Sequence, residues 1–123
     1  MTVGRSEPLV VVISRLPILR EALSEAFAGI AEVRHFPAER AELDGLLESI
    51  DPDAVVVDGE EAAETAAAFA RGSRVPVVHL SLQDESLRVF DGGSWSVRVD
   101  GNGSADSIAN AVLGGIYGRR KES

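Results

Sequence analysis

Short apolar runs alternate along this chain with longer segments in which apolar residues recur every three or four positions. The runs are rich in valine and contain few polar residues, a pattern typical of strands buried on both faces of a parallel sheet. This pattern predicts strands over residues 9–13, 33–36, 54–57, 75–80 and 95–99.

The segments between the runs have the periodicity of amphipathic helices. In the first of them an apolar stripe extends from Leu19 to Ile30, and Pro17 suits the first helical turn. Asp51 with Pro52 is expected to end the second helix. We expect helices over residues 17–30, 43–50, 60–71 and 104–118.

This alternation predicts an α/β protein with a five-stranded parallel sheet, doubly wound by helices as a three-layer (βα)5 sandwich. Between the fourth and fifth strands only residues 84–90 fit a helix, so we expect a fourth helix that is shortened or irregular. Residues 1–123 are expected to form a single domain, with its core at 8–118 and a tail or linker start at 119–123.

Composition narrows the classes of function. The 123 residues carry a formal net charge of −8, which disfavours the binding of phosphate backbones by this domain. There is no cysteine, no apolar run long enough to span a membrane and no start typical of a signal peptide. We therefore expect a cytoplasmic protein that contacts neither nucleic acid nor membrane through this domain.

Polar residues follow three of the predicted strands. Ser14 and Arg15 come after the first strand, Asp58 after the third and Ser81 after the fourth. Because the carboxyl ends of parallel strands converge on one crevice, we expect these side chains to lie near one another. The crevice would then hold a carboxylate, hydroxyls and a guanidinium, with no second acid at either strand end.

This organisation resembles the receiver domain of bacterial response regulators over roughly residues 8–118. Residues 14–23, Ser-Arg-Leu-Pro-Ile-Leu-Arg-Glu-Ala-Leu, are similar to the segment after the first strand in receivers attached to helix-turn-helix output domains. Residues 51–58, Asp-Pro-Asp-Ala-Val-Val-Val-Asp, resemble the stretch that ends in the phosphoacceptor aspartate. Residues 75–81, Val-Pro-Val-Val-His-Leu-Ser, resemble the fourth strand with its terminal switch hydroxyl.

The resemblance implies that Asp58 stands at the phosphoacceptor position and Ser81 at the switch position. It also implies a departure at the end of the first strand. Receivers carry two acids there, which hold Mg²⁺ together with the phosphoacceptor, and in this chain Ser14 and Arg15 replace them.

A second departure removes another charged group. The lysine that receivers carry at the end of the fifth strand is replaced by Asp100 or Gly101. Phosphoryl transfer to a carboxylate needs cations to offset the repulsion between like charges, and one carboxylate is a poor magnesium site. We therefore expect no catalytic residue, no metal site and no bound Mg²⁺, but a pseudo-receiver in which Arg15 forms a charge-assisted pair with Asp58.

Simpler interpretations remain open for the same residues. Asp58 with Gly59 is also a common pair in turns, Ser81 also suits the cap of a strand, and Arg15 also suits a solvated loop. For His79, on an otherwise apolar strand, we expect a hydrogen-bonded histidine in the core.

The loop formed by Gly101, Asn102, Gly103 and Ser104 suggests an alternative function. Two glycines before a helix N-terminus can form a nest of backbone N–H groups that binds an anion. The alternative is a sensor domain that binds an anionic metabolite in the crevice at the carboxyl ends of the strands. The simpler interpretation is a flexible loop followed by a helix cap at Ser104.

Trp95, Leu113 and Tyr117 are candidates for a partner surface. The last predicted helix is apolar over a broad arc that includes Leu113 and Tyr117, and the glycines at 114–115 allow close approach of another backbone. Trp95 suits either an aromatic anchor or the filling of an edge strand. We expect a protein partner, including a second copy of this chain as a homodimer.

Together these observations predict a non-catalytic, phosphorylation-independent, receiver-like signalling module that acts through protein–protein contacts. The resemblance implies that the module belongs to a transcriptional response regulator of a two-component phosphorelay. DNA would then be bound by a further C-terminal domain, whose linker would begin at residues 118–121.

Overall fold

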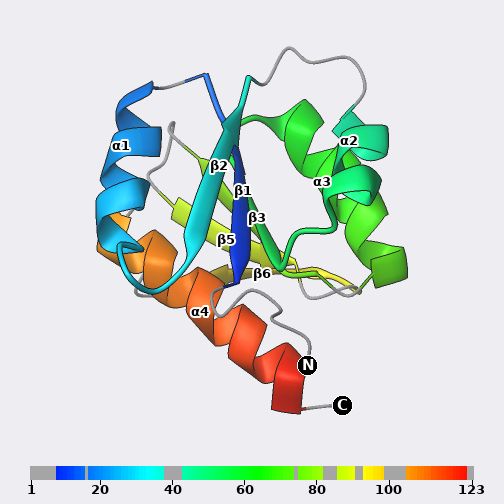
Figure 1. Ribbon diagram of the computed structural model, residues 1–123. Coiled ribbons are helices and arrows are strands. Elements are labelled where there is room, and N and C mark those ends of the chain that lie inside the picture. Colours follow the sequence, from blue (N-terminus) through cyan, green and yellow to red (C-terminus); the bar gives the residue numbers. More distant parts are fainter. Residues whose placement is uncertain are drawn as a thin grey trace, which may run out of the picture.

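A mixed six-stranded sheet lies between two layers of helices (Figure 1). The structure is a computed structural model that describes residues 8–15, 17–37, 43–73, 75–81, 86–90, 93–98 and 105–121. Within these residues the elements are β1 Leu9–Ile13, α1 Pro17–Ala26, β2 Glu32–Phe36, α2 Leu43–Ile50, β3 Ala54–Val57, α3 Glu60–Ser73, β4 Val77–Ser81, β5 Ser86–Phe90, β6 Trp95–Arg98 and α4 Ala105–Lys121. The strand order is β2-β1-β3-β4-β5-β6.

Each face of the sheet packs against its own pair of helices, so the α/β class and the three layers are confirmed. Figure 1 shows α1 and α4 on one side of the sheet and α2 and α3 on the other. The first core cluster, on the α1 and α4 side, includes Val10, Val12, Leu23, Phe27, Leu87, Ile108, Val112 and Ile116. The second core cluster, on the α2 and α3 side, includes Leu9, Val11, Ile13, Leu47, Val55, Val57, Ala66 and Phe90.

The prediction of five parallel strands is wrong. Strands β1 to β4 pair in parallel, but β5 runs antiparallel to both β4 and β6. The expected short or irregular fourth helix is wrong for the same reason, because residues 86–90 form β5. A strand therefore occupies the sheet where a covering helix was expected.

The spacing of apolar residues in β5 explains this error. Leu87 and Phe90 are three residues apart, which places them on one face of a helix but on opposite faces of a strand. Both side chains are fully buried, Leu87 in the first core cluster and Phe90 in the second. Two-sided burial of so short a segment favours the strand, and Val89 adds β propensity.

Residues with positive φ angles follow the ends of α1 and α2. Gly29 has a φ of 77°, and α1 ends at Ala26, so the predicted continuation of the helix to Ile30 is wrong. Ile30 lies beyond the helix with 41% of its surface exposed. The predicted end of α2 is confirmed: Asp51 adopts a φ of 57° and donates its N–H to the carbonyl of Leu47.

Gly115 lets α4 approach the segment before β4 closely. A Cβ atom built on Gly115 would lie 2.6 Å from Cβ of Pro76, whereas one built on Gly114 would meet nothing within 4 Å. The close approach that the paired glycines predicted therefore occurs at Gly115, and it is made with a segment of the same chain.

We expect Gly115→Ala to destabilise the fold by about 1–3 kcal/mol, because the added methyl group overpacks the contact with Pro76. Gly114→Ala is the matched control. It is expected to be neutral or to stabilise the helix by up to about 1 kcal/mol, since alanine has the higher helix propensity. Urea unfolding of both variants measures the difference, and equal midpoints would contradict this account of the contact.

Candidate functional site

Ser14 is held in place by hydrogen bonds from three of its groups. Its N–H donates to the carbonyl of Phe36 at 3.2 Å, and its own carbonyl lies 3.1 Å from Nε2 of His35. A carbonyl can only accept, so His35 is the donor and carries a proton on Nε2. The Ser14 hydroxyl donates to Oδ2 of Asp58 at 2.6 Å. Ser14 is thus held in a fixed position at the carboxyl end of β1.

The register of the central strands produces the contact between Ser14 and Asp58. Ile13 pairs with Val57 in the parallel ladder of β1 and β3, so the residues that directly follow them stand level. Both strands are buried valine-rich runs, and a slip of one residue would turn their core side chains to the opposite face. The same burial that fixes the sheet therefore fixes the distance between hydroxyl and carboxylate.

Arg15 does not take the role expected for it. Asp58 is half-buried, and its partner within the described residues is the hydroxyl of Ser14 in place of the guanidinium of Arg15. Arg15 lies exposed on the loop that leaves β1. The described hydrogen-bond donor to Asp58 is thus a neutral hydroxyl, which satisfies one carboxyl oxygen without supplying a positive charge.

The remaining predicted residues are brought together only in part. Ser81 is the last residue of β4, half-buried, at the same edge of the sheet as Asp58. Leu113 is half-buried against the first core cluster. Asp100 and the expected ligand loop, Gly101 to Ser104, lie outside the described residues, as does the side chain of Tyr117.

A second polar group contains His79, which the sequence analysis identified, and Arg88, which it did not. His79 is 3% exposed, and its Nδ1 lies 2.6 Å from Nη2 of Arg88, its direct partner across the antiparallel pair of β4 and β5. A guanidinium has no acceptor, so Nδ1 accepts and the imidazole is neutral, with its proton on Nε2. The prediction of a hydrogen-bonded core histidine is confirmed, but its partner could be found only by knowing that residues 86–90 form a strand.

Trp95 completes this group. The guanidinium carbon of Arg88 lies 5.0 Å from the centroid of the indole ring, and the imidazole of His79 meets the same ring edge-on at 5.9 Å. Trp95 also packs on Phe90, with the ring centroids 5.2 Å apart. The indole is half-buried against the second core cluster, so it fills the edge of the core while part of it stays exposed.

Asp53 also has a role that the sequence pattern did not indicate. Its Oδ2 accepts the N–H of Leu9 at 2.7 Å, and its own N–H donates to the carbonyl of Leu9 at 2.8 Å. This exchange secures the start of β1 beside the start of β3. Asp53 is therefore a structural residue that precedes β3, at the end of this strand opposite to Asp58.

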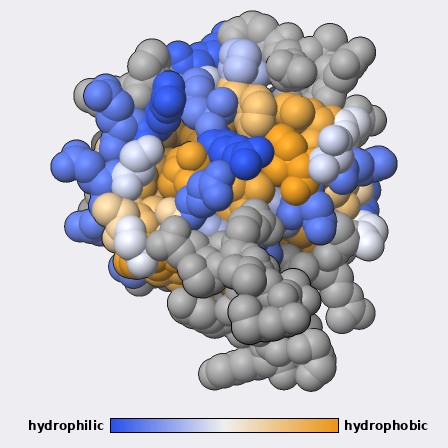
Figure 2. Space-filling view, viewed as in Figure 1, coloured by the Kyte–Doolittle hydropathy of each residue, from blue (hydrophilic) through white to orange (hydrophobic). Residues whose placement is uncertain are grey.

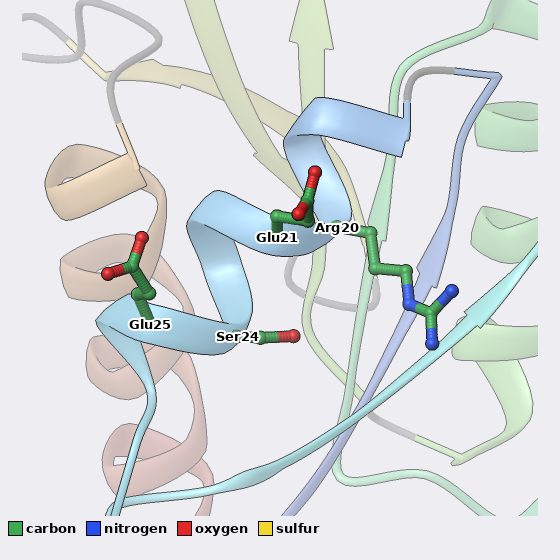
Figure 3. A pocket seen from close by; sticks show the side chains of 4 residues that line it. All are labelled: Arg20, Glu21, Ser24 and Glu25. Atoms are coloured by element: carbon green, nitrogen blue, oxygen red, sulfur yellow. The ribbon is translucent and has the colours of Figure 1, made fainter.

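A hollow of about 550 Å³ lies on the outer side of α1 and is lined by Arg20, Glu21, Ser24 and Glu25. Figure 3 shows that these side chains point in different directions along the helix. A binding site needs polar groups that converge on a ligand, and this open hollow offers none.

Among the described residues, no three histidine or acidic side chains cluster in a way that would hold a metal ion. No described helix combines the length and the apolar character needed to cross a membrane. No family model matches this chain, and no curated protein or solved structure matches it. The resemblance to receiver domains therefore stays a prediction that rests on the chain's own residues.

We expect a coupling free energy of about 1–2 kcal/mol between Ser14 and Asp58 in a double-mutant cycle of Ser14→Ala and Asp58→Ala, because the hydroxyl donates to a charged acceptor. The matched control pairs Ser81→Ala with Asp58→Ala and is expected to be additive. Chemical unfolding measures both cycles. Equal coupling free energies in the two cycles would show that the hydrogen bond between Ser14 and Asp58 is not the source of the coupling.

Arg88→Met is expected to destabilise the fold by about 1–3 kcal/mol, because it leaves the buried Nδ1 of His79 without a donor. Combining it with His79→Phe should recover part of the loss, since the orphaned acceptor is then removed. Trp95 is the only tryptophan, so its fluorescence follows unfolding at this cluster. The exposed-residue control is Arg20→Met. If Arg88→Met lowers the free energy of unfolding no more than this control does, Arg88 does not stabilise the fold through His79.

Proposed function

We propose that this chain is a non-catalytic, phosphorylation-independent signalling module that resembles receiver domains and acts through protein–protein contacts. The observation that carries the proposal is the 2.6 Å hydrogen bond from Ser14 to Asp58 at the carboxyl ends of β1 and β3. Asp58 stands where the resemblance expects a phosphoacceptor, and its nearest described partner is a buried neutral hydroxyl.

Charge supports the absence of phosphoryl transfer. A phosphoryl group that approaches Asp58 brings negative charge to a carboxylate, so a divalent cation and a positive side chain must offset the repulsion. Magnesium prefers several oxygen ligands, and the end of β1 supplies Ser14 and Arg15 in place of two acids. Ser14 is 1% exposed, and its hydroxyl already donates a hydrogen bond to Asp58. Both features restrict rearrangement of the residues around Asp58.

Accessibility supports a non-catalytic role. The Ser14 hydroxyl is buried, so it is not presented to a substrate as a nucleophile would be. The neutral imidazole of His79 is equally enclosed and is bound by Arg88. Ser14, Asp58 and His79 thus have structural partners, which favours a domain that transmits information through its surface.

The outer part of the sheet supports a role in protein contacts. On the α3 side, Val97 is 63% exposed and Trp95 is half-buried, so apolar surface remains accessible on β6. We propose a cytoplasmic module of a transcriptional regulator, in which surfaces such as this one contact a protein partner and a separate domain binds DNA. The net charge of −8 agrees with that division of roles.

The proposal predicts that acetyl phosphate with Mg²⁺ adds no phosphoryl group to Asp58, because the cations needed for transfer are replaced. Intact-protein mass spectrometry measures the adduct, with Asp58→Asn as the control for modification at other sites. Beryllofluoride with Mg²⁺ should likewise leave the amide NMR spectrum unchanged. A phosphoryl adduct that the wild-type chain gains and Asp58→Asn lacks would overturn the proposal.

A further inference from the structure

We propose that two copies of this chain pair through β2 in an antiparallel arrangement, with the two-fold axis at Val33, so that their sheets become continuous. This inference rests on the self-association contained in the proposed function and names its surface. The experiment below reads the oligomeric state, so its failure would leave the question of phosphorylation at Asp58 untouched.

The backbone of β2 offers a free edge for this pairing. β2 is the first strand in the sheet order, and within the described residues only β1 pairs with it. The N–H of Glu32 donates to the carbonyl of Pro8, and the carbonyl of Phe36 accepts from Ser14, so the even-numbered residues of β2 face β1. In a strand these directions alternate, and Val33 and His35 therefore direct their N–H and C=O groups away from β1.

The charges on β2 select one register. Pairing of outward groups with outward groups requires the two-fold axis to lie at a residue, and the three central residues of β2 are Val33, Arg34 and His35. An axis at Arg34 places two guanidinium groups opposite each other, and an axis at His35 places Arg34 opposite Phe36. An axis at Val33 places Glu32 opposite Arg34 twice, in the closely spaced pairs that lack backbone hydrogen bonds. Only this register joins opposite charges.

The side chains of Glu32 and Arg34 can exchange their contact within one strand for contacts across the two-fold axis. Arg34 Nε lies 2.9 Å from Oε2 of Glu32 within one strand, and the two side chains are 53% and 43% exposed. Both project on the same face of β2, because they are two residues apart. An exposed ion pair of this kind contributes little to the monomer, so re-forming it across the axis costs little.

Hydrophobic surface flanks this edge on both sides. Figure 2, viewed onto the β2 edge, shows hydrophobic side chains around a central hydrophilic strip. Val33 is half-buried against the first core cluster, and Phe36, Leu46 and Ile50 are half-buried against the second. Ile30 is 41% exposed, and the register at Val33 brings it toward Phe36 of the second copy. Burial of these groups would add to the backbone pairing.

Analytical ultracentrifugation over a concentration series tests this arrangement. The wild-type chain is expected to dimerise, and Glu32→Arg or Arg34→Glu alone should weaken the dimer at least about tenfold, because each creates two like-charge pairs across the axis. The combined swap of Glu32→Arg with Arg34→Glu should restore wild-type affinity. Glu64→Arg, an exposed reversal on α3, is the control and should have no such effect.

A second measurement keeps the test decisive if a charge variant unfolds. The chain has no cysteine, so Val33→Cys provides a single thiol at the proposed axis. A short bismaleimide is expected to link two such chains efficiently and to leave Ala68→Cys, on the exposed face of α3, largely unlinked. A wild-type monomer throughout the series, a swap that fails to restore the dimer, or equal linking of both thiols would overturn the proposal.

Discussion

The burial of β1, β3 and β4 on both faces is the constraint on which the rest of this structure depends. Their valine-rich side chains leave no polar face for water, so helices must cover the sheet on each side. That cover aligns the strands in parallel and fixes their register, and the register in turn sets Ser14 beside Asp58. The candidate site is therefore a by-product of core packing: the polar residues begin where the two core clusters end.

The outer strands β5 and β6 are covered only in part by helices, and polar and aromatic side chains cover the rest of this part of the sheet. β5 still buries Leu87 and Phe90 on opposite faces, and Arg71 at the end of α3 lies 5.7 Å from the Phe90 ring. Further out, Arg88 binds His79 and lies over Trp95. A guanidinium that binds an imidazole and stacks on an indole covers apolar surface while remaining partly in water. This cluster replaces the missing helix as cover for the edge of the second core cluster.

Much of the architecture could be predicted from periodicity, and the errors have a common cause. The helix expected over residues 60–71 and the strand expected over residues 9–13 are confirmed as α3 Glu60–Ser73 and β1 Leu9–Ile13, because a single pattern fits each of them. The strand over residues 86–90 was not predicted, since the spacing of Leu87 and Phe90 fits a helix as well as a strand and tertiary burial decides. Asp58 and Ser14 could be located from their strand ends, but their hydrogen bond depends on a register that the sequence does not state. Arg88 could not be found, because its partnership with His79 exists only in the antiparallel pair.

The reversed direction of β5 also changes how the sheet is assembled from the chain. Parallel neighbours such as β1 and β3 must be joined through a long crossover that contains a helix, and Ser14 after β1 lies 44 positions along the chain from Asp58 after β3. The meander of β4, β5 and β6 instead pairs segments that follow one another directly along the chain. Short loops lose little entropy on closure, so this half of the sheet has a low contact order. The molecule thus combines a half built from long-range strand pairs, which carries Ser14 and Asp58, with a half built from local strand pairs.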